Sequence, residues 1–126
     1  MKIYNFGPKR GEKIEKFDSD FIFSRITHSN TGVKVSCFHL TANGVVGYHQ
    51  ATTQQLFLVL RGKGWVRGGF PNRIPIAENQ AVFWDKNEWH EAGTDTGLVA
   101  IVIEGDFMNP SDFMSMDWDG FPNQPY

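Results

Sequence analysis

Turn-forming residues divide this chain into short segments, and this division constrains the fold more than any other feature of the sequence. The segments between the turns are apolar or alternate between apolar and polar residues, and no long stretch has the period of a helix. They lie at 20–28, 33–41, 55–62, 63–69, 73–77, 81–85, 89–93 and 98–105. Turn signals recur about every eight to twelve residues, a spacing that is typical of an all-β sandwich or barrel.

Three of these segments carry specific local predictions. The segments 55–62 and 63–69 follow each other so closely that a hairpin is expected between them. Pro75 lacks a backbone N–H group, so it confines the strand 73–77 to a sheet edge or a bulge. Turns are expected at 29–32 and 42–44, where Ser, Asn, Thr and Gly residues gather.

The length of 126 residues suits a single domain over 1–126, with a barrel core at about 20–105. Eleven Phe and four Trp residues supply enough apolar surface for a core without disulfides. The remaining residues, 106–126, form an acidic tail that is rich in Met and aromatic residues. We expect this tail to pack on the barrel or on a partner subunit, with one short helix at 110–116; a loosely ordered tail is the alternative.

Charge and hydropathy limit the partners and the location of the protein. The net charge of −2 and the pI near 6.0 provide no basic surface for nucleic acid. No apolar run approaches the roughly 20 residues that a membrane helix needs. The N-terminal residues lack the apolar stretch of a signal peptide, which favours the cytoplasm. Cys37 is the single cysteine, which excludes an internal disulfide, and it is expected to be a small buried side chain.

Two segments carry the residues that point to a function. The first reads G-x4-H-x-A-x3-Q-x6-G and contains His49, and the second, 79–94, is centred on His90. Both resemble the two motifs of the cupin superfamily, in which a His-x-His pair and a Glu precede a glycine, and a further His follows a Pro-x-Gly turn. The resemblance covers roughly residues 30–105. It implies a cupin-type double-stranded β-helix, or jelly-roll, barrel.

The departures from the family motifs concern the metal ligands above all. Ala51 stands where the second histidine belongs, and Gln55 stands where the glutamate belongs. In the second motif the Gly, Pro, Gly and Asn positions hold Asn79, Asp85, Asn87 and Thr94. The stretch from Asp85 to Glu88 still favours a tight turn, because Asp and Asn side chains bond to nearby backbone. We therefore expect the fold to be kept and the metal site to be altered.

By the resemblance, the candidate metal ligands are His49, Gln55 and His90. Two imidazoles and one amide oxygen are all neutral, so a divalent transition metal (Zn, Ni, Cu, Fe or Mn) would be held weakly. Such a metal would keep open positions and a positive charge, which favours a small anionic ligand. Without metal, the three side chains would form a polar cluster that needs a ligand or water as a partner.

Alternation along the strands predicts which residues surround this site. His49, Ala51, Gln55, Phe57 and Val59 share one parity and should face the same side. The candidate walls of a ligand pocket are Phe57, His39, Trp84 and Trp65. The opposite parity of the strand 55–62 is also apolar, so its outer face needs cover from an N-terminal strand, the tail or a second subunit. Cupins often form dimers through such a face, so the resemblance implies a homodimer.

The resemblance implies a barrel that binds a small molecule, and it leaves two classes of function open. The first is an enzyme that acts on a small anionic compound, either through a metal or, without metal, through a histidine as general base. The second is a non-catalytic module that binds or senses a ligand. The altered ligand set favours the second class, and retention of His49 and His90 favours the first.

Overall fold

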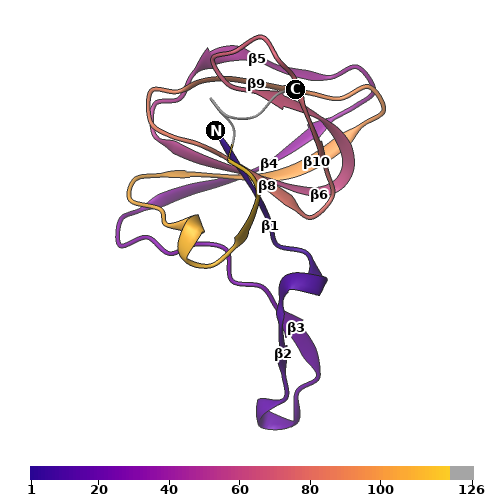
Figure 1. Cartoon of the computed structure of the whole chain (residues 1–126), viewed down its shortest axis with the longest axis vertical. Helices are drawn as coiled ribbons and strands as arrows, with labels where there is room; N and C mark the ends of the chain where they lie inside the picture. Colours follow the sequence, from indigo (N-terminus) through magenta and orange to yellow (C-terminus); the bar gives the residue numbers. More distant parts are fainter. Residues whose placement is uncertain (120–126) are drawn as a thin grey trace.

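The computed structural model describes residues 1–119, in which every regular element is a β-strand or a short 3₁₀ turn (Figure 1). The part of the expected tail at 120–126 lies outside the described residues. The strands are β1 (Lys2–Asn5), β2 (Glu12–Ile14), β3 (Phe21–Phe23), β4 (Val33–Leu40), β5 (Val45–Gln50), β6 (Gln54–Arg67), β7 (Ile74–Ala77), β8 (Gln80–Trp84), β9 (Trp89–Gly93), β10 (Leu98–Gly105) and β11 (Ser115–Trp118). The prediction of an all-β fold is therefore confirmed.

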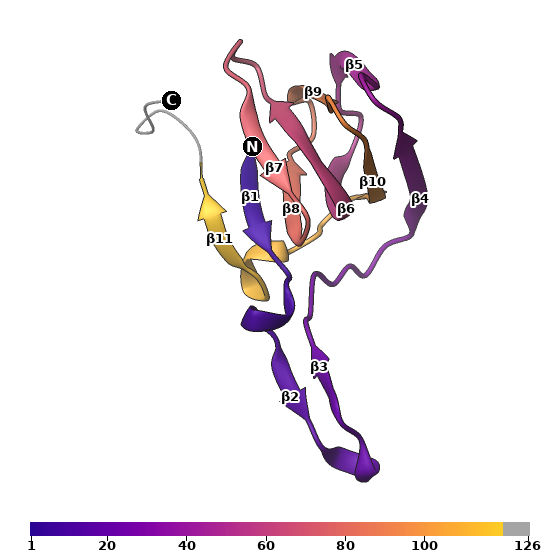
Figure 2. The same ribbon diagram turned by 90° about the vertical axis from the view of Figure 1, so that its right-hand side faces the viewer.

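Nine of the strands form two layers that share β6, and β2 and β3 pair separately with each other. One sheet has the order β11-β1-β8-β6-β10-β4, and all its pairs are antiparallel. In the other sheet β6 lies between β7 and β9, and β9 also pairs with β5. The first part of β6 belongs to the first sheet and its last residues belong to the second, so this strand joins the two layers seen in Figure 2.

The predicted hairpin between 55–62 and 63–69 is wrong, because β6 continues through both segments. Gly62 adopts a φ of 89°, and a Cβ atom there would lie only 2.3 Å from the carbonyl oxygen of Gly97. The register with β10 shifts two residues earlier, at Leu60, because Val99 pairs with Arg61 and Ala100 pairs with Val59. A bulge of this kind bends the strand from one sheet into the other without reversing it.

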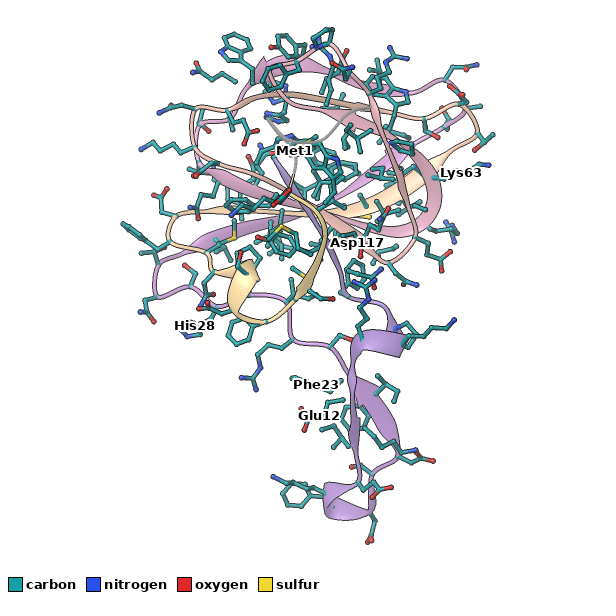
Figure 3. The ribbon with its side chains drawn as sticks, in the orientation of Figure 1. Met1, Glu12, Phe23, His28, Lys63 and Asp117 are labelled. Carbon is teal, nitrogen blue, oxygen red and sulfur yellow. The ribbon has the colours of Figure 1, made fainter. Side chains whose placement is uncertain are left out.

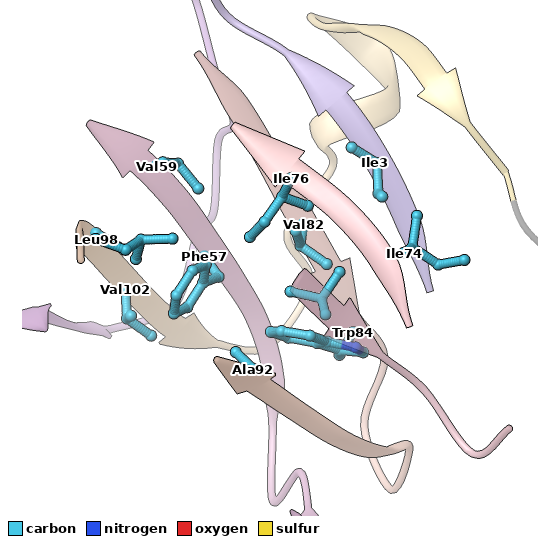
Figure 4. Packing of buried hydrophobic residues seen from close by; sticks show 12 residues of the cluster. Ile3, Phe57, Val59, Ile74, Ile76, Val82, Trp84, Ala92, Leu98 and Val102 are labelled. Atoms are coloured by element: carbon cyan, nitrogen blue, oxygen red, sulfur yellow. The ribbon is translucent and has the colours of Figure 1, made fainter. Parts of the chain in front are cut away.

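Alternation along β6 divides the core into two clusters. Phe57 and Val59 face the barrel interior, where they pack with the residues shown in Figure 4. Leu56 and Leu58 face the other side of the sheet and pack with Met108 and other apolar residues. Both faces of this strand are thus buried, as its apolar sequence predicts.

The tail packs on the outer face of the first sheet. Met108 and Met114 are buried in the cluster that contains Leu56 and Leu58. The predicted helix at 110–116 forms only as a 3₁₀ turn at Pro110–Asp112. It stops there because β11 begins at Ser115 and pairs with β1.

The N-terminal region differs most from the sequence-based prediction. β1 lies between β11 and β8, and its Ile3 and Tyr4 are buried in the core. The predicted strand 20–28 forms only as β3, because this segment pairs with the short β2. The resulting hairpin projects from the barrel, and Figure 3 shows its paired residues Glu12 and Phe23 well away from the barrel core.

The outer strand β4 exposes one face. Phe38 and Leu40 pack against the core, so Cys37 and His39, which alternate with them along the strand, point outward. Cys37 is exposed, and the prediction of a buried thiol is wrong for this reason. Across residues 1–119 there is no helix of the length and hydrophobicity that crossing a membrane requires.

Candidate functional site

His49 and His90 lie together at one end of the second sheet. They are Cα partners on the antiparallel strands β5 and β9. Their imidazole centroids are 4.3 Å apart, and the rings are inclined at 55°. His90 is only 2% exposed, whereas His49 is open to solvent. The pair therefore places one imidazole at the surface directly beside a buried one.

Backbone carbonyl groups fix the orientation of both rings. Nδ1 of His49 lies 2.6 Å from the carbonyl oxygen of Gly47, and Nδ1 of His90 lies 3.2 Å from that of Glu88. A carbonyl oxygen can only accept a hydrogen bond, so each Nδ1 is the donor. In the neutral ring this leaves Nε2 as an acceptor for a ligand or a metal ion.

The surroundings of His90 keep its imidazole neutral. Burial lowers the pKa of His90 below its ordinary value of 6.5, and His49 lowers the pKa further. The hydrogen bond to the carbonyl oxygen of Glu88 and the carboxylates of Glu88 and Glu104 act in the opposite direction but do not outweigh burial. His90 is thus a hydrogen-bonding group, and not a cation, at neutral pH.

Two aromatic residues form the inner wall beside His90. The Trp84 ring lies 4.5 Å from the His90 ring, with an angle of 31° between them. Phe57 meets Trp84 edge to face, with ring centroids 6.0 Å apart (Figure 4). Trp84 is 1% exposed, and within residues 1–119 its Nε1 is the one buried side-chain nitrogen or oxygen without a hydrogen-bond partner. An unpaired buried N–H group of this kind calls for a water molecule or a ligand.

Gln55 bonds to a carboxylate that the sequence analysis did not identify. Its Nε2 donates a hydrogen bond to Oε1 of Glu104 over 3.1 Å, and the two residues are Cα partners on β6 and β10. Glu104 shares the parity of Ala100 and Val102, which face the barrel core. Glu104 was missed because it lies outside both motifs. This shared parity is the sequence signal that could have identified it.

The turn of the second motif forms as predicted. The Glu88 N–H donates to the Asp85 carbonyl oxygen over 3.1 Å, and the Asp85 N–H donates to the Glu88 carboxylate over 2.9 Å. Asn87 adopts a φ of 70°, which Asn tolerates better than most residues. Ala51 is buried and exchanges backbone hydrogen bonds with Asn87 and Glu88, so it ties the end of the first motif to this turn.

Two of the predicted pocket residues lie elsewhere. His39 is exposed on the outer face of β4, opposite to the core-facing Phe38. Trp65 packs over Gly93, where a Cβ atom would lie 2.3 Å from the indole ring, and Arg73 covers it at 3.7 Å. The bulge at Leu60 reverses the parity of β6, so that Val66, and not its neighbour Trp65, faces the core. His39 thus lies on the outer face of β4 and Trp65 lies over Gly93, and their role as pocket residues stays a prediction.

The described side chains do not form a complete cage for a metal ion. Within residues 1–119 no three His, Cys, Asp or Glu side chains are grouped closely enough to hold one. His49 and His90 can supply two imidazoles, while the amide nitrogen of Gln55 is engaged by Glu104. A metal ion bound here would need further ligands besides the His49 and His90 imidazoles.

Comparisons with known proteins identify the fold. No protein-family model matches the chain, and no curated protein matches it by sequence. Among solved structures, a cupin superfamily protein from Desulfitobacterium hafniense aligns with a TM-score of 0.56 and 14% identity, covering 68% of this chain and 77% of that one. A cupin-2 domain containing protein from Shewanella frigidimarina aligns with a TM-score of 0.52 and 14% identity, covering 64% and 76%.

A third solved structure agrees with these two. It is an uncharacterised conserved protein with a double-stranded β-helix domain from Klebsiella pneumoniae, which aligns with a TM-score of 0.54 and 10% identity over 75% of this chain and 82% of that one. Identities this low establish the architecture and not the activity. The chain has the double-stranded β-helix fold of the cupin superfamily, as its two motifs predict.

Proposed function

We propose that this protein binds a small molecule at the end of the barrel where His49 lies over His90. The observation that carries the proposal is the pair itself: an exposed and a buried imidazole, 4.3 Å apart, with the buried ring packed against Trp84. A molecule that enters from the solvent side meets His49 first. Two Nε2 acceptors and the unpaired indole N–H of Trp84 are the polar groups that would fix its orientation.

The second candidate function is a metal-assisted reaction on a small anionic compound. It is favoured by the backbone carbonyl groups that hold both Nδ1 atoms, because histidines that bind metal through Nε2 are commonly oriented in this way. His49 and His90 would hold a Zn, Ni, Cu, Fe or Mn ion, with the Gln55 amide oxygen as a weak third ligand. When bound, such an ion would supply Lewis-acid chemistry.

The assembly and location remain predictions. A homodimer would cover apolar side chains that the barrel leaves exposed, among them Phe21 on the hairpin and Val35 on β4, which are 48% and 62% exposed. We also expect the protein in the cytoplasm. Light scattering at micromolar concentration tests the dimer, and a monomeric mass would count against it.

The experiment that tests the proposed function begins with tag-free protein from which metal has been removed. A library of small cationic, neutral and anionic compounds is screened for stabilisation against heat, since a ligand of the native state raises the melting temperature. We expect at least one compound to stabilise the wild type and to lose this effect in His49→Ala. His39→Ala is the matched control, because His39 is also an exposed histidine and lies on the outer face of β4.

The same preparation separates the two candidates. Stoichiometric metal in the protein as purified, measured by mass spectrometry and lost in both His49→Ala and His90→Ala, would establish the metal-assisted alternative. Ligand binding that survives complete removal of metal supports the first candidate. If no compound in the library stabilises the wild type, or if His49→Ala responds like the wild type, the proposed site is wrong.

A further inference from the structure

Glu104 is placed where it can act on a ligand of the histidine site. It is the penultimate residue of β10, on the face that Ala100 and Val102 turn to the core, and it is half-buried. Its carboxylate accepts the hydrogen bond from Gln55, the residue at the motif position where a glutamate is expected. The chain therefore has an amide at that motif position and a carboxylate directly across the β6–β10 ladder.

Two carboxylates act on the buried histidine of the pair. Glu88 and Glu104 both raise the pKa of His90, in opposition to burial and to His49. Glu88 is neutralised by the Met1 amino group, 2.5 Å away. Within residues 1–119 the Glu104 carboxylate forms no ion pair within 4 Å. Lys34, its Cα partner on β4, is the cation that a ligand would have to compete with.

Space for a ligand group exists beside Glu104. An open cavity of about 320 Å³ is lined by Glu104, Asp106, Lys34 and the hydroxyl residues Thr52 and Thr53. Thr52 and Thr53 follow Ala51 directly, so this cavity borders the loop that connects His49 to Gln55. Two carboxylates and one ammonium group line it, which leaves an excess of negative charge. A cation is favoured there over an anion.

We propose that Glu104 makes the histidine site selective for small organic cations, whose ammonium group it binds while the rest of the molecule contacts the His49–His90 pair. This inference rests on the proposed function of that pair. Glu104 is thus a specificity-determining residue. It attracts the ammonium group by a charge-assisted hydrogen bond, and Gln55 holds its carboxylate in position. The ligand class is opposite in charge to the anion that a metal-loaded site would favour.

Three probes that share a three-carbon chain test this selectivity: trimethylenediamine as the cation, trimethylene glycol as the neutral molecule and malonate as the anion. Binding to metal-free protein is followed by nuclear magnetic resonance at the Gln55 side-chain amide and at the His49 and His90 rings. In the wild type we expect the diamine to bind at least tenfold more tightly than the glycol or malonate. Its binding should shift the Gln55 and histidine signals together.

Two variants with opposite expected effects on diamine binding make the test specific. Glu104→Gln keeps the shape of the side chain and an acceptor for Gln55, and we expect it to weaken diamine binding at least tenfold. Lys34→Gln removes the competing ammonium group from the cavity and should strengthen diamine binding. Glu78→Gln, an exposed carboxylate in a turn, is the matched control and should leave binding unchanged.

The results that would overturn the inference are distinct from those that would overturn the proposed function. Equal binding of all three probes at the histidines, tighter binding of malonate, or a diamine affinity unchanged in Glu104→Gln would reject the role of Glu104 and leave the histidine site standing. A diamine that shifts the Gln55 signal but neither histidine would reject the histidine site. Zinc that binds stoichiometrically to the wild type and is lost in Glu104→Gln would make Glu104 a metal ligand and reject its role as a selector of cations. The absence of any signal shift with the diamine would also reject the inference.

Discussion

The imidazoles of His49 and His90 lie 4.3 Å apart across one antiparallel pair of strands. His49 is exposed to solvent, whereas His90 is buried and only 2% exposed. The two histidines come from different motifs that are 41 positions apart in the sequence (90 − 49). The fold brings them together because β5 and β9 are neighbours. Their proximity is the basis of the proposed site.

The buried position of His90 predicts a pH-dependent stability. Its pKa is lowered below 6.5 in the folded protein, mainly by burial. As the pH falls below 6.5 towards this lowered pKa, the unfolded state binds more protons than the native state, so the free energy of unfolding decreases. Urea denaturation across this range measures the effect.

The control for this prediction is a comparison of two histidine variants. His90→Phe, which can still pack on Trp84, should flatten the pH dependence, whereas His28→Gln at an exposed position should leave it as in the wild type. An identical pH profile for the wild type and His90→Phe would contradict the assignment of the effect to His90.

Gly93 should not tolerate a side chain. A Cβ atom at this position would lie 2.3 Å from the Trp65 indole ring, which is held in place by Arg73. We expect Gly93→Ala to destabilise the protein by about 1–3 kcal/mol through overpacking. Gly69→Ala, where nothing lies within 4 Å of the added atom, should stay within about 0.5 kcal/mol of the wild type. Equal urea midpoints for the two variants would show that Trp65 moves aside freely.

The tail should contribute to stability through Met114. This side chain is 6% exposed and packs in the cluster that contains Leu56 and Leu58. Met114→Ala should therefore cost about 2–5 kcal/mol, the range for a large-to-small change in a core. Met116 lies two residues further on and is 42% exposed, so Met116→Ala serves as the matched control. Calorimetric melting that is unaffected by Met114→Ala would mean that this contact is not made in solution.

Much of the barrel could be predicted from the sequence because its strands are short and strongly patterned. The segments 89–93 and 98–105 coincide with β9 and β10. The continuity of β6 could not be predicted, because a glycine between two apolar runs is compatible with both a hairpin and a bulge. Only the close approach of Gly62 to Gly97 decides between them.

The site could be predicted only in part. The motif spacing identified His49 and His90, which the structure brings together. His39 could not be assigned to a face, because β4 has apolar residues at both parities, such as Val35 outside and Phe38 inside. Glu104 depends on the register between β6 and β10, which no local pattern specifies.

The central claim is that a small molecule binds over the His49–His90 pair. Its most direct test is nuclear magnetic resonance of the four histidine rings during titration of metal-free protein with the best compound from the stability screen. The account predicts that the His49 and His90 signals shift together with one dissociation constant, while the exposed His28 and His39 stay unchanged. A ligand that binds without shifting either His49 or His90 would contradict it.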